Sequence, residues 1–188
     1  LYCYEQLGEN IEAINTLNNL LEINPYNEVA WHQLGKIYLK INKSEEALSA
    51  FEFAIISDDC FTGAYIEKGK LLEQMGRINE AIDNYEFSLN FNDPNAFVNH
   101  RIGLCHLKLG NDKLAVRYLE ESIKLEPNHE KSWIALIDFL IDSKDYLKAQ
   151  HYVKKSLQSN SDSIPLWKKS ALIHFQLNFY EETVVGCE

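Results

Sequence analysis

Apolar residues recur along the chain at helical spacing, in stretches that come in pairs. One such pair is Trp31, Leu34, Ile37 and Tyr38, then Ala47, Leu48, Phe51, Ala54 and Ile55. Steps of three and four place these residues on one face of an amphipathic helix. Short polar turns such as Asn42-Lys43-Ser44 and Gly110-Asn111-Asp112 separate the stretches. Such residues end and begin helices, so the pattern predicts a series of helical hairpins.

These hairpins repeat with a period of 34 residues. The period is carried by alanines, by glycines and by the large residue four positions after each alanine: Ala13, Ala47, Ala81, Ala115 and Ala149; Gly35, Gly69 and Gly103; Leu17, Phe51, Tyr85, Leu119 and Val153. Small residues such as Gly35 and Ala47 would let the paired helices approach closely. Because one hairpin cannot bury its own apolar stripe, neighbouring copies must stack.

The segment Trp31-His32-Gln33-Leu34-Gly35-Lys36-Ile37-Tyr38, with Ala47 and Phe51 after it, follows the pattern W-x₂-L-G-x₂-Y…A-x₃-F. Pro25 and Pro127 stand where that pattern closes a repeat. Over essentially its whole length the chain resembles the tetratricopeptide repeat (TPR) family. The resemblance implies an all-α fold, an α-solenoid of antiparallel helix-turn-helix repeats wound as a right-handed superhelix, with about five and a half repeats.

We therefore expect one solenoid domain over residues 1–188. It consists of a partial repeat, four full repeats and a second partial repeat: 1–27; 28–61, 62–95, 96–129 and 130–163; 164–188. The predicted first helices are 28–41, 62–75, 96–109, 130–143 and 163–176, and the second helices are 44–57, 78–91, 112–125, 146–159 and 179–188. The first partial repeat should hold a short helix over 1–7 and another over 10–22. Neither end shows a polar capping helix, so we expect part of a longer protein that self-associates through its ends.

Composition excludes several classes of function. The net charge of −10 argues against a general nucleic-acid binder, because phosphate contacts need a basic face. The four cysteines (Cys3, Cys60, Cys105 and Cys187) form no C-x-x-C motif or Cys/His cluster, so we expect no metal and reduced thiols, which favours a cytoplasmic location. No apolar run approaches the ~18 residues of a membrane span, so we expect no direct membrane insertion.

The TPR resemblance implies a concave groove lined by the first helix of each repeat. Its groove positions fall here on His32, Lys36, Leu39, Lys40, Ile66, Lys70, Glu73, Phe97, His100, Leu104, Leu107, Lys108, Ile134, Asp138, Lys168 and Phe175, and also on Val29, Gln74, Lys131, Ile141, Asp142, Leu172 and Gln176. The apolar members would form an exposed patch typical of a binding site.

The central part of this groove has more lysines than carboxylates. Lys36, Lys40, Lys70 and Lys108 stand against Glu73 alone. This predicts a peptide partner with acidic residues or a free C-terminus, whose binding should fail when the lysines become Glu. The family's carboxylate clamp for chaperone tails is not reproduced, because His32 and Glu67 stand where that site has Lys and Asn.

The sequence thus favours a protein–protein interaction scaffold that binds a peptide or protein segment and needs no cofactor. The alternative is a regulatory or substrate-recruiting TPR region of a larger enzyme or sensor. We expect no enzyme activity within these residues, because no catalytic motif such as H-E-x-x-H or G-x-S-x-G occurs.

Overall fold

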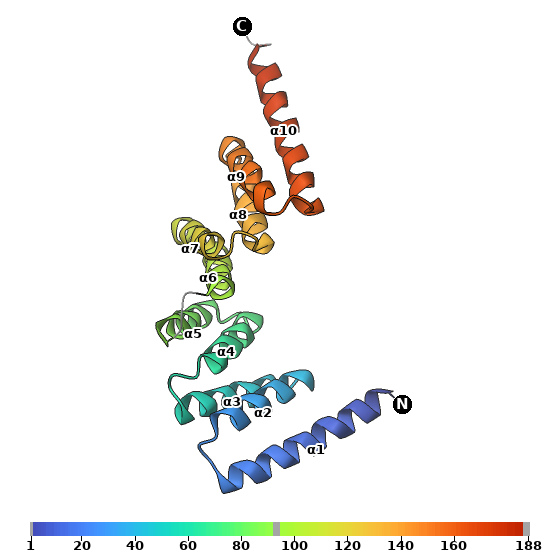
Figure 1. Cartoon of the computed structure of the whole chain (residues 1–188), viewed down its shortest axis with the longest axis vertical. Coiled ribbons are helices and arrows are strands. Elements are labelled where there is room, and N and C mark those ends of the chain that lie inside the picture. Colours follow the sequence, from blue (N-terminus) through green and yellow to red (C-terminus); the bar gives the residue numbers. More distant parts are fainter. Residues whose placement is uncertain (1, 92–94, 186–188) are drawn as a thin grey trace. The chain divides into compact units, whose positions relative to one another are not determined.

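The computed structural model describes the backbone of residues 2–91 and 95–185 and the side chains of residues 8–91 and 95–178. Over these residues the chain is entirely helical, without a strand (Figure 1). The helices are α1 (Tyr2–Ile23), α2 (Glu28–Lys40), α3 (Ser44–Ser57), α4 (Thr62–Gln74), α5 (Ile78–Phe91), α6 (Ala96–Lys108), α7 (Asp112–Leu125), α8 (Glu130–Asp142), α9 (Tyr146–Ser159) and α10 (Ile164–Val185). The all-α fold is confirmed, and α2 to α9 begin and end within one residue of the predicted bounds.

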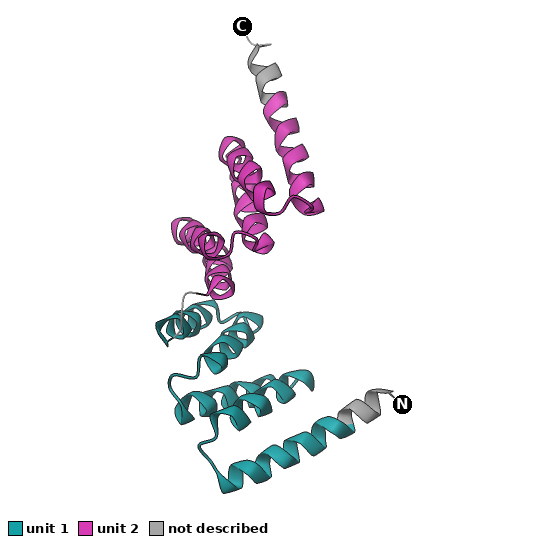
Figure 2. Ribbon diagram, in the orientation of Figure 1, with its two compact units in different colours: residues 1–93 teal, residues 94–188 magenta. Residues whose placement is uncertain are grey.

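The helices fall into two compact units, residues 1–93 and residues 94–188 (Figure 2). In unit 1, α2 packs on α3 and α4 packs on α5; in unit 2, α6 packs on α7 and α8 packs on α9. Each of these pairs is an antiparallel hairpin of the predicted kind. The single domain over 1–188 and the hand of a superhelix stay predictions.

A left-handed residue closes the turn inside each of these four hairpins. Asn42, Gly76, Gly110 and Lys144 have φ angles of 60°, 78°, 71° and 59°. They are spaced by one repeat. The chain can therefore reverse direction in the three residues between the helices.

The periodic glycines lie where the two helices of a hairpin touch. A Cβ atom on Gly35 would lie 2.5 Å from Cε1 of Phe51, and one on Gly69 would lie 2.7 Å from Cε1 of Tyr85. On Gly103 it would lie 2.8 Å from Cγ of Leu119. All three facing side chains are fully buried, so they have little room to move. The predicted close approach is confirmed.

Gly35→Ala should destabilise the fold, although alanine favours a helix over glycine by about 1 kcal/mol. Overpacking against the Phe51 ring costs about 1–3 kcal/mol, so we expect a net loss of roughly 1 kcal/mol or more. Gly8→Ala is the matched control, since nothing lies within 4 Å of the added Cβ in α1 and the substitution should stabilise. Urea unfolding followed by circular dichroism measures both, and shifts of the same sign would contradict this account.

Tryptophan indoles tie the turn between repeats to the helix that follows it. Nε1 of Trp31 donates to the carbonyl oxygen of Pro25 at 2.8 Å, and Nε1 of Trp133 donates to that of Pro127 at 2.8 Å. Trp167 donates likewise to Ser161 at 2.7 Å. The indole hydrogen bond therefore links each tryptophan to the repeat-closing position six residues before it.

The core of unit 2 runs from α7 to α10. Trp133, Leu136 and Ile137 of α8 are at its centre, and Leu119 of α7 and Val153 of α9 pack against them. This core holds α6, α7 and α8 in place around the groove described below.

The terminal helices correct two predictions. α1 and α10 are continuous, whereas the sequence predicts breaks near Gly8 and Asn178. Both residues are in register with the left-handed turn positions. A turn at these positions would break helical hydrogen bonds. The packing of a second helix must offset that loss of free energy. The surroundings of Gly8 are open, and Leu172 and Phe175 of α10 are 44% and 67% exposed, so that packing is lacking and the helix continues.

Candidate functional site

Unit 2 carries an open groove of about 670 Å³ between the first helices of its two hairpins. It is lined by His100, Arg101, Leu104 and Leu107 of α6, Asp112 of α7, and Lys131, Ile134, Ala135, Asp138, Phe139 and Asp142 of α8. Its apolar members are half-buried, because the side turned away from the groove packs on the core. The result is an apolar floor with charged residues at its edges.

This groove brings together five residues that the TPR resemblance predicts for the third and fourth repeats: His100, Leu104, Leu107, Ile134 and Asp138. Lys131 and Asp142 join them. Phe97, Lys108, Lys168 and Phe175 are exposed but do not line it. Asp112, Ala135 and Phe139 are additions from the structure, and no groove position of the family identified them.

A buried chain of hydrogen bonds lies next to the groove and joins α6, α7 and α8. The hydroxyl of Ser122 donates to the carbonyl oxygen of Ala96 at 2.7 Å. The oxygens of Ser122 and Ser132 are 2.7 Å apart, and Ser132 lies 2.6 Å from Nδ1 of His129 and 3.1 Å from Nδ1 of His100. Ser122 and Ser132 are fully buried.

Counting protons fixes the direction of each bond. Because Ser122 has given its only proton to Ala96, Ser132 must donate to Ser122. The oxygen of Ser132 then accepts from Nδ1–H of both His100 and His129. The two imidazoles are therefore held in one tautomer and one orientation, and that of His100 forms part of the groove wall.

In unit 1, His32 lies among aromatic rings. Its ring centre is 5.9 Å from that of Phe51 and 5.2 Å from that of Phe61. Its Nε2 atom is buried without a hydrogen-bond partner in the described part of the chain. Burial lowers the pKa of His32, the charges of Lys36 and Lys70 lower it further, and Glu67 opposes them. The charges of Lys36 and Lys70 thus act on His32.

One carboxylate, that of Glu67, changes the charge balance predicted for the lysines. Nζ of Lys70 lies 2.8 Å from Oε1 of Glu67, three residues before it on α4. The i, i+3 spacing could have revealed this pair from the sequence. Lys36 and Lys40 remain exposed on α2, while Leu39 and Ile66 are half-buried.

The structure corrects the assignment of Glu73 to an open groove. Glu73 is 7% exposed, and its Oε1 accepts a hydrogen bond of 2.8 Å from the hydroxyl of Tyr85. Tyr85 is fully buried. The carboxylate therefore joins α4 to α5 inside the hairpin.

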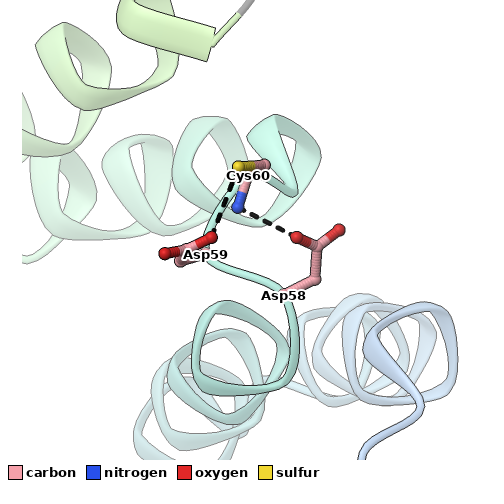
Figure 3. A group of neighbouring side chains, drawn as sticks. All are labelled: Asp58, Asp59 and Cys60. Carbon is pink, nitrogen blue, oxygen red and sulfur yellow. Dashed lines mark hydrogen bonds between the residues drawn. The ribbon is translucent and has the colours of Figure 1, made fainter.

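One further cluster of polar groups lies in the turn between α3 and α4 (Figure 3). Side-chain ligand atoms of Asp58, Asp59 and Cys60 lie within 4.8 Å of one another. The backbone N–H of Cys60 donates to Asp58 at 3.0 Å, and its thiol donates to Asp59 at 3.3 Å. The bond to Asp59 raises the pKa of the Cys60 thiol. These hydrogen bonds thus stabilise the turn between α3 and α4.

The relatives of this chain include proteins of known assemblies. It is 25% identical over 178 residues to a BBSome complex member BBS4 homolog of Drosophila melanogaster, covering 94% of this chain and 37% of that protein. The chain thus spans little more than a third of this relative. No helix in the described residues is long and apolar enough to cross a membrane.

Solved structures share the fold. The crystal structure of MamA superposes with a TM-score of 0.75 at 21% identity, over 84% of this chain and 92% of that one. The structure of YrrB, described as a TPR protein with an unusual peptide-binding site, superposes with a TM-score of 0.70 at 18% identity, over 86% and 84%.

Three sequence models of the tetratricopeptide repeat match this chain. They cover residues 16–49, residues 96–129, and residues 1–27 with 62–92. The matches fall in both units, and those over residues 62–92 and 96–129 coincide with the hairpins α4–α5 and α6–α7. The chain belongs to the tetratricopeptide repeat family.

Proposed function

We propose that this TPR chain is a protein-interaction scaffold and that the groove of unit 2 holds a segment of its partner. The carrying observation is an apolar floor of Leu104, Leu107 and Ile134 that stays open to solvent between α6 and α8. Concave apolar surfaces with a few polar groups at the edge are typical of binding sites.

The comparisons support this class of function. The fly relative is named as a member of a complex, and YrrB is described by a peptide-binding site. Similarity to a member of a complex supports a role as a scaffold over a role as a regulatory or substrate-recruiting region of an enzyme. We propose no catalytic role for these residues, since His100 and Glu73 are held in buried hydrogen bonds. A turnover by the purified chain that Ile134→Glu abolishes would overturn this view.

Ile134→Glu should abolish capture of the partner, because it places a charge on the apolar floor of the groove. The expected loss of affinity is roughly tenfold or more, as for a central interface residue. Affinity capture from cell extract, read by mass spectrometry, compares this variant with the wild-type chain.

Leu147→Glu is the matched control, since Leu147 is 72% exposed on α9 and does not line the groove. Circular dichroism checks that both variants fold. A partner that Ile134→Glu retains would place the binding site elsewhere on the chain.

We further propose that Lys36 and Lys40 of unit 1 bind acidic residues of a partner. Both lysines are exposed on α2 and make no ion pair within the described residues. The double variant Lys36→Glu, Lys40→Glu should weaken capture, most strongly at low salt. The same charge change at Lys154 and Lys155 on α9 is the control, and equal binding by both variants would remove the proposal.

We also propose that the terminal helices mediate self-association. Ile23 of α1 is 84% exposed and Phe175 of α10 is 67% exposed. Light scattering over a range of concentrations should show a mass that rises with concentration, and a constant monomer mass would refute the idea.

A further inference from the structure

We propose that the unit 2 groove selects a peptide segment of mixed charge. The acidic group of that segment lies at the start of α8, its basic group lies at the end of α8, and apolar side chains lie between them. This inference rests on the proposed function of the groove and adds the chemical class of its ligand.

One end of the groove is cationic. Lys131 stands in the first turn of α8, and Arg101 stands in the second turn of α6. The two residues lie near each other, because His100, next to Arg101, contacts Ser132, next to Lys131, at 3.1 Å. Lys131 is exposed and makes no ion pair with any described residue. The N-terminus of α8 adds partial positive charge at the same end.

The other end is anionic. Asp142 is the last residue of α8, and Asp138 stands one turn before it. Asp112, the first residue of α7, lines the same groove directly after the end of α6. Asp138 is already paired with Lys169 of α10. Asp112 and Asp142 are exposed, and within the described part of the chain neither has an ion-pair partner.

The apolar floor separates the two ends. Lys131 and Asp142 are eleven residues apart on one helix, which corresponds to about 16 Å along its axis. An extended peptide advances about 3.3 Å per residue, so its acidic and basic groups would be about five positions apart. The residues between them would present apolar side chains to Ile134 and Leu104. A segment with only acidic residues would place a carboxylate beside Asp142, which is unfavourable.

The test is selection from a random peptide display library on three forms of the chain: wild type, Lys131→Glu and Asp142→Lys. We expect the wild type to enrich peptides with one acidic and one basic group around an apolar centre. Lys131→Glu cancels the charge of Arg101 at the cationic end, so enriched peptides should keep the basic group and lose the acidic one. Asp142→Lys cancels the charge of Asp112 at the anionic end, so enriched peptides should keep the acidic group and lose the basic one.

Each enriched peptide is then synthesised, and its dissociation constant is measured by fluorescence anisotropy on all three forms and on Lys155→Glu, a charge control outside this groove. We expect each peptide to bind its selecting form at least tenfold more tightly than the oppositely charged form. The inference fails if the enriched peptides lack the expected arrangement of charges and bind all charge variants equally well. The proposed function still stands in that case, provided that these peptides lose affinity on Ile134→Glu. If no form enriches peptides beyond Ile134→Glu, the proposed groove function itself fails.

Discussion

Trp133→Ala should destabilise unit 2 by about 3–5 kcal/mol, the largest effect that we expect from a single substitution here. Trp133 is 1% exposed and packs in the core with Leu136, Ile137 and Leu119. Its removal leaves a cavity among side chains that cannot collapse into it. It also leaves the carbonyl oxygen of Pro127 without its indole donor.

Trp167 provides the matched control because it occupies the same repeat position and makes the same indole hydrogen bond, but is 55% exposed. Trp167→Ala should therefore cost only about 1–2 kcal/mol. Urea unfolding compares the two variants, and amide hydrogen exchange of α7, α8 and α9 localises the loss, since repeats can open locally. Similar losses in the two variants would show that the hydrogen bond, and not burial, determines the effect.

Ser132→Ala should cost about 2–3 kcal/mol although it removes a single oxygen atom. That oxygen accepts from Nδ1–H of both His100 and His129 and donates to Ser122. His100 is 6% exposed, so its donor would be left unsatisfied, at about 1–3 kcal/mol for each such group. His129 is half-buried and can bond to water in part.

Ser156→Ala is the control, because Ser156 is as deeply buried but donates only to Val153 of its own helix, at 2.8 Å. Alanine already stands at the equivalent position of an earlier repeat, at Ala54. We expect a change within about 1 kcal/mol. Chemical denaturation measures the free energy of unfolding of both serine variants. Equal values would show that the hydrogen-bond network of Ser132 adds no extra stability. The imidazole proton resonances of His100 and His129 should shift in Ser132→Ala alone.

The repeat architecture could be predicted from the sequence because it depends on local, periodic patterns. The spacing of Trp31, Gly35 and Phe51 specifies a hairpin whose helices touch at the glycine, and the structure has this contact. The groove residues Leu104, Leu107 and Ile134 could also be predicted, since their repeat positions fix the helix face on which they lie.

The tertiary structure decided what depends on neighbours outside the repeat pattern. Glu73 occupies a groove position, yet the hydroxyl of Tyr85 draws it into the hairpin. Gly8 and Asn178 occupy turn positions, yet α1 and α10 continue because a turn forms only where a second helix packs against the first. The groove likewise forms only when α6 and α8 lie side by side, which brings Arg101 and Asp112 to its two ends. Periodicity thus determined the helices and their faces, whereas contacts between side chains determined which of those faces remain open to a partner.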